Sequence, residues 1–143
     1  MSEGERRRLE RLSMAANLMM TYLCQDFRVP PAQCPMVTVA SGEEVREKCG
    51  ADACGCYLFR EGEIILSPEC AELKALLHEF CHHLQFLDAG GDPKRAYSDF
   101  DKPHCQRPHE REAKLFETIF RLFYGETWDK VKKKAGVEHE RGA

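Results

Sequence analysis

The residues of this chain that could do chemistry begin with the pentapeptide His-Glu-Phe-Cys-His at positions 78–82. Residues four positions apart on an α-helix are separated by about 40° around its axis, so His78 and His82 would point the same way. Two imidazoles at this spacing can bind one zinc ion, and the carboxylate of Glu79 can activate the zinc-bound water. The alternative is a coincidental pair of surface histidines.

The sequence around the pentapeptide predicts a helix that follows a strand. Residues 62–68 form a short apolar run closed by proline, which is typical of a strand that ends before a helix. Over residues 69–87, leucine and phenylalanine recur every three or four positions, which indicates an amphipathic helix. The motif residues lie along one border of its apolar stripe, where a metal site would be half shielded and half open to a substrate.

Zinc held by two histidines needs a third protein ligand, with the fourth position left to water. The candidates lie downstream: His104, His109, Glu110 and Glu112. The two glutamates would start a second helix, which must pack against the first to bury its aromatic stripe. Acidic residues near a helix N-terminus are also favoured by the helix dipole with no metal present. Periodicity places the glutamates on opposite borders of the stripe and does not choose between them.

The remaining sequence predicts an N-terminal helix at 5–27, a strand at 36–40, a short polar helix or turn at 42–48, and a hairpin with strands at 56–59 and 63–66. Residues 88–107 are rich in Gly, Pro and Asp and predict a loop without regular structure. We therefore expect an α+β fold: a small, mainly antiparallel sheet of about three strands, packed with the N-terminal helix, the motif helix and a glutamate-bearing helix.

The glutamate-bearing helix is predicted to begin near Pro108, because proline suits the first turn of a helix. Gly125 is predicted to end this helix, and residues 126–136 to add a short terminal one. The predicted buried stripe consists of apolar residues at helical spacing: Ala113, Phe116, Ile119, Phe120 and Phe123.

Length and charge limit the classes of function. A chain of 143 residues with 43% hydrophobic content predicts a single domain over residues 1–143. A net charge of −3 argues against nucleic acid as the main partner, since phosphate binding needs a concentrated basic surface. No stretch approaches the roughly 20 apolar residues that cross a bilayer, and the start does not lead into a signal peptide. We expect a cytoplasmic protein that acts on a protein or peptide and not on a membrane; the oligomeric state is left open.

The chain has eight cysteines, which is many for a cytosolic protein. Most of them could be small buried apolar residues, as expected of Cys24 and Cys81. One or two structural disulfides are a second interpretation, which would indicate an intracellular protein of a hyperthermophile. A separate zinc site at Cys49, Cys54 and Cys56 is a third, although the paired Cys-x2-Cys spacing is missing.

The motif together with residues 110–116, Glu-Arg-Glu-Ala-Lys-Leu-Phe, resembles the ImmA/IrrE family of zinc metallopeptidases, whose second signature runs Glu-x-x-Ala-(Asn/Asp)-x-Phe-Ala. It is also similar to the very small gluzincin peptidases. The resemblance extends over roughly residues 55–124 and implies that Glu110 is the third zinc ligand. The sequence departs from the family at Lys114 and Glu117, so the support that orients a zinc histidine is expected to come from outside that helix.

The resemblance implies hydrolysis of peptide bonds, in which Glu79 takes a proton from the zinc-bound water and passes it to the departing amine. Tyr97 or His104 could face the developing oxyanion. The substrate backbone is expected to pair with a sheet edge at Glu63–Leu66. His83 lies about 140° around the helix from the first motif histidine, so we expect it at the surface or in a supporting role. The alternative functions are a catalytically silent zinc-bound regulatory or adaptor protein and a latent peptidase.

Overall fold

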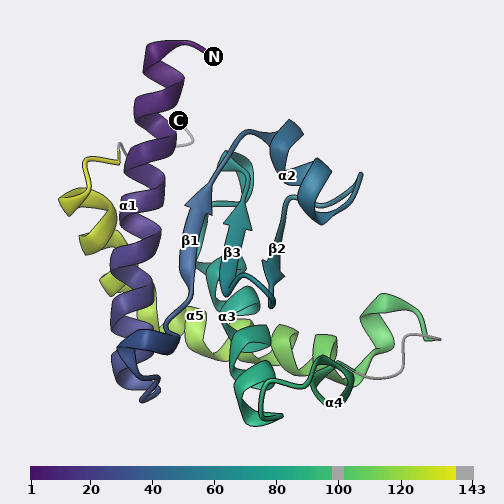
Figure 1. The fold of residues 1–143 in the computed structure, drawn as a ribbon. Helices are drawn as coiled ribbons and strands as arrows, with labels where there is room; N and C mark the ends of the chain where they lie inside the picture. Colours follow the sequence, from purple (N-terminus) through teal and green to yellow (C-terminus); the bar gives the residue numbers. More distant parts are fainter. Residues whose placement is uncertain (98–101, 138–143) are drawn as a thin grey trace.

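The computed structural model describes residues 1–97 and 102–137 (Figure 1). The helices and strands follow the order α1 (Glu3–Asp26), β1 (Met36–Val39), α2 (Gly42–Cys49), β2 (Gly55–Leu58), β3 (Glu63–Leu66), α3 (Leu73–Asp88), α4 (Pro93–Ala96) and α5 (Pro108–Lys134). The α+β class and the small three-stranded sheet are as predicted. No helix of the described residues is both long enough and apolar enough to cross a membrane.

The sheet has the strand order β1-β3-β2 and is mixed. β2 and β3 form the predicted antiparallel hairpin, and Gly62 supplies the positive φ of 62° in its turn. β1 is parallel to β3, because the chain returns through α2 and β2 before it reaches β3. β3 is therefore the central strand. The prediction that a substrate pairs with Glu63–Leu66 is wrong, because both sides of that strand are already paired.

Side chains of α1 cover the outer edge of β1. Asn17 donates to the carbonyl of Val37 at 2.7 Å and accepts from its N–H at 2.9 Å. The hydroxyl of Ser13 accepts from the N–H of Val39 at 2.9 Å. A helix thus takes the place of a further strand at this edge, and β2 is left as the other edge of the sheet.

The two faces of the sheet have different covers, as the alternation of side chains along a strand requires. On one face, Ile64 and Leu66 are buried in the main core with residues of α1, α3 and α5. On the other face, Ile65 packs against Val45 of α2. Phe80 of α3 is fully buried, so the helix that carries the motif is fixed by its apolar side.

α5 differs from its prediction in length and in orientation. It runs without interruption through Gly125, from the α4 end of the molecule to the side of α1 (Figure 1). Ile119 and Phe123 are 53% and 74% exposed, so their predicted burial is wrong. The side chains that the helix buries are His109, Ala113, Glu117, Tyr124, Trp128 and Val131.

The predicted loop at 88–107 contains regular structure. Asp92 caps α4 by accepting a hydrogen bond from the N–H of Lys94 at 3.0 Å, and Pro93 occupies the first turn. A 3₁₀ turn at His104–Gln106 leads into α5. Residues 98–101 of this segment lie outside the described residues.

Candidate metal centre

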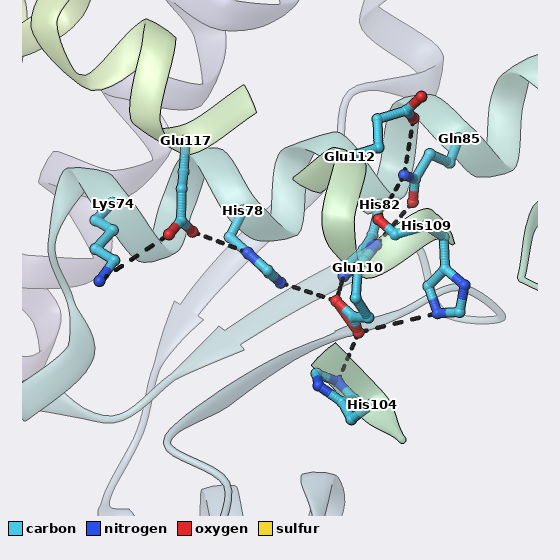
Figure 2. Close-up of polar contacts among 9 residues, drawn as sticks. All are labelled: Lys74, His78, His82, Gln85, His104, His109, Glu110, Glu112 and Glu117. Carbon is cyan, nitrogen blue, oxygen red and sulfur yellow. Dashed lines mark hydrogen bonds and ion pairs between the residues drawn. The ribbon is translucent and has the colours of Figure 1, made fainter. Parts of the chain in front are cut away.

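The structure brings together the three residues that the sequence and the resemblance proposed as metal ligands (Figure 2). His78 and His82 lie one turn apart on α3, and Glu110 lies in the first turn of α5. One carboxylate oxygen of Glu110, Oε1, is 3.0 Å from Nε2 of His78 and 2.7 Å from Nε2 of His82. The three ligand atoms lie within 4.8 Å of one another, so this group could hold a metal ion.

The two imidazoles are oriented by acceptors on their other nitrogens. Nδ1 of His78 lies 2.8 Å from a carboxylate oxygen of Glu117, and Nδ1 of His82 lies 2.8 Å from the amide oxygen of Gln85. Because both partner atoms can only accept, each Nδ1 carries a proton, and Nε2, which faces Glu110, is the nitrogen that could bind a cation after giving up its own proton. Two imidazole nitrogens and one carboxylate oxygen match a zinc site that leaves one position open.

Glu117 supports His78, so the prediction that this support lies outside the helix is wrong. α5 buries the side chain of Glu117 to 5% exposure against His78. Lys74 of α3 lies 4.0 Å from the other carboxylate oxygen, as Figure 2 shows. The support for this histidine therefore comes from α5 itself, about two turns beyond Glu110.

The other proposed ligands lie around Glu110 instead of completing the same group. Glu112 accepts a hydrogen bond from Nε2 of Gln85 at 2.9 Å, and the same nitrogen donates to the carbonyl of His109. His104 contacts the second oxygen of Glu110 at 2.6 Å, and Nε2 of His109 is 3.9 Å from it. Of the two glutamates, Glu110 is thus the one at the histidines, and Glu112 holds the amide that orients His82.

The charges of the cluster keep Glu110 ionised. Burial alone would raise the pKa of Glu110, but the hydrogen bonds from His78 and His82 outweigh it and hold this pKa well below its usual range. Burial alone would lower the pKa of His78, but Glu110, Glu79 and Glu117 outweigh it and raise the pKa to about 9. An ionised carboxylate between two imidazoles attracts a cation strongly.

Glu79 differs from Glu110 in its contacts and in the direction in which its pKa is shifted. It is half-buried beside the histidines and makes no hydrogen bond or ion pair with residues 1–97 or 102–137. Burial raises the pKa of its carboxyl above the ordinary value. A carboxylate with a raised pKa is a better proton acceptor than one whose pKa is lowered.

A cavity of about 490 Å³ adjoins the metal group. Glu79, both motif histidines and Glu110 line one side, and Gly55, Cys56 and Tyr57 of the β2 edge line the other. Tyr97 and His104 also line it, which places both proposed oxyanion donors at the site. The hydroxyl of Tyr97 already donates to the carbonyl of His82 at 2.7 Å.

His83 is buried, so its predicted surface position is wrong, whereas a supporting role fits. Its Nε2 donates to the carbonyl of Gln33 at 2.6 Å, and its Nδ1 accepts from the hydroxyl of Tyr57 at 2.7 Å. Burial, only partly offset by the bond to Gln33, lowers the pKa of His83. A neutral histidine thus ties α3 to β2 and leaves the metal to its neighbours.

Among the described residues, six cysteines form three disulfides: Cys24–Cys34, Cys49–Cys56 and Cys54–Cys70. This overturns both the interpretation that most cysteines are reduced and the proposed zinc site at Cys49, Cys54 and Cys56. Two of the disulfides brace the segment between α2 and β2, which forms part of the cavity wall. Cys81 is a buried free thiol whose pKa burial raises to about 12, so it is a packing residue as predicted.

No family model, curated protein or solved structure matches this chain. The resemblance to the ImmA/IrrE family therefore rests on the quoted motif residues alone.

Proposed function

We propose that this protein is a zinc-dependent metallopeptidase. The observation that carries the proposal is the convergence of His78, His82 and Glu110 beside a cavity that Glu79 also lines. Metal ligands with a free base at their side are the arrangement that hydrolysis of an amide needs. The resemblance of the motif to the ImmA/IrrE family points to the same activity.

Zinc is the proposed ion because two imidazoles and one carboxylate are its usual ligands in hydrolytic sites. When bound, it would supply the Lewis acid that polarises the scissile carbonyl and lowers the pKa of water. Glu79 would take the proton of the attacking water and deliver it to the leaving amine. Glu117 and Gln85 would hold the two histidines in the protonation state that binds the ion.

A protein or peptide in extended conformation is the proposed substrate, and β2 is the proposed docking strand. β2 is the sheet edge that lines the cavity, whereas α1 covers the edge at β1. An extended segment can add to such an edge through backbone hydrogen bonds. This replaces the predicted pairing at β3 and keeps the segment next to Glu79.

The experiment that tests the activity is the substitution Glu79→Gln. It removes the base but none of the ligands, so the variant should retain one zinc per chain and lose cleavage of a denatured-protein or peptide library. Glu126→Gln, an exposed position on α5, is the matched control and should cleave like the wild type. Cleavage by Glu79→Gln at the wild-type rate would refute the assignment.

The alternative is a regulatory or adaptor protein with the same metal site and no cleavage. It is supported if the wild type cuts nothing and Glu79→Gln leaves the biological effect intact.

The proposed cytoplasmic location requires that the disulfides form in the cytoplasm, whereas three disulfides are typical of oxidising compartments or of hyperthermophiles. Counting the free thiols of protein isolated from its own cells tests whether the disulfides form there.

A further inference from the structure

Leu115, Ile119, Leu122 and Phe123 form an exposed apolar surface on α5, which we call the α5 stripe. Leu122 and Phe123 are 86% and 74% exposed, and Leu115 and Ile119 are 60% and 53% exposed. Half of the exposed large hydrophobic residues among the described residues thus lie within nine consecutive positions of one helix. Contiguous apolar surface of this kind is typical of an interaction site.

The charges at the two ends of the stripe indicate what could cover it. Arg111 lies before the stripe and Asp129 after it, and about five helical turns separate them, so they share one side of α5. Arg111 makes no ion pair with any residue in 1–97 or 102–137. Asp129 is 3.7 Å from Lys132 and keeps its side chain 61% exposed.

We propose that the α5 stripe is the interface of a two-fold symmetric dimer of this chain. An antiparallel pairing of the two α5 helices would bury both stripes against each other and place Arg111 of each copy next to Asp129 of the other. A parallel pairing would instead bring like charges together at both ends. A self-complementary patch of this kind is what two-fold symmetry requires, and a near-antiparallel crossing lets the contacts extend along the whole stripe.

The proposed interface borders the metal centre. A groove of about 850 Å³ is lined by Arg111, Leu115 and Thr118 on the side of the stripe and by His78 and Glu110 on the side of the site. A second copy bound to the stripe would form one wall of this groove. It would therefore line one path by which a molecule could reach the candidate metal centre. Peptidase activity is not needed for this inference.

Sedimentation velocity over a concentration series, on zinc-loaded protein without substrate, tests the proposal. The wild type should sediment as a species of twice the 16.4 kDa chain mass. Leu122→Glu should raise the dimer dissociation constant roughly thirtyfold or more, the loss expected at a central interface residue. Met14→Glu is the matched control, because Met14 is 55% exposed on α1, and it should leave the dimer unchanged.

A charge exchange tests the antiparallel arrangement. Arg111→Asp and Asp129→Arg should each weaken the dimer, and the double variant should restore it to near the wild-type constant. Unchanged zinc content and circular dichroism show that each variant is folded. A wild type that is monomeric at every concentration, an equal loss in Met14→Glu, or a double variant no stronger than the single ones would overturn the proposal.

Discussion

The imidazole of His78 is held from both sides, by Glu110 at Nε2 and by Glu117 at Nδ1. The two glutamates come from the same helix and have different tasks. Glu110 would offer its oxygen to a metal ion, and Glu117 would accept the proton on Nδ1 and so leave Nε2 as the nitrogen that faces the ion. The same division applies to His82, for which Gln85 is the acceptor.

Replacing Glu117 with alanine should lower the zinc affinity by about ten- to a hundredfold, because His78 would lose the acceptor that orients its ring. Glu117→Gln should lose less, because the amide oxygen can still accept from Nδ1. A competition titration with a chromogenic zinc chelator measures both variants. Glu126→Ala, exposed on the same helix, should bind zinc like the wild type; an equally high affinity in Glu117→Ala would contradict the role of Glu117.

The three residues that could hold a metal ion were predicted from the sequence, but the residues that orient the histidines were not. His78 and His82 are fixed by a local spacing, and Glu110 was reached through the resemblance to a known signature. Glu117 carries no such signal, because a glutamate on a helix is ordinarily a solvated surface residue. Only the packing of α5 on α3 shows that this one is buried.

At the level of elements, local signals predicted where helices and strands form, and long-range packing decided the rest. Gly125 was expected to end α5, since glycine disfavours a helix by about 1 kcal/mol. Burial of Tyr124, Trp128 and Val131 on the core outweighs this and keeps the helix continuous. The parallel pairing of β1 with β3 likewise has no local signal, because it joins segments on either side of α2 and β2.

α1 and α5 share the main core and are also joined by a hydrogen bond whose contribution to stability should vary with pH. The hydroxyl of Tyr124 donates to Asp26 at 2.7 Å. Burial, and then the hydrogen bond and charge of Asp26, raise the pKa of Tyr124 above the ordinary value near 10. The bond should therefore contribute fully below about pH 10, where Tyr124 is neutral in both the folded and the unfolded chain, and less as the pH rises toward the folded pKa.

Tyr124→Phe should lower the free energy of unfolding by about 1.5 kcal/mol near neutral pH, the contribution of a hydrogen bond to a charged acceptor. The difference from the wild type should be constant from about pH 7 to 9 and should shrink above about pH 10. Urea denaturation at each pH measures it. Tyr22→Phe, a half-exposed position on α1, is the control; a Tyr124→Phe variant as stable as the wild type would show that the bond does not hold the two helices.

For the whole molecule, a bound ion would be a cross-link between α3 and α5, two helices on either side of the segment that contains α4. An ion that binds only the folded chain stabilises it in proportion to its affinity, by about 2.7 kcal/mol at a concentration one hundred times the dissociation constant. For a domain of this size, that corresponds to a rise in Tm of roughly 8 °C.

Calorimetry of EDTA-treated protein with and without zinc should show this rise in the wild type and in Glu79→Gln, which keeps every ligand. Glu110→Ala should abolish the rise, and Glu112→Ala should retain most of it, because Glu112 contacts Gln85 and not the histidines. A full rise in Glu110→Ala, or none in the wild type, would mean that the ion does not join these two helices.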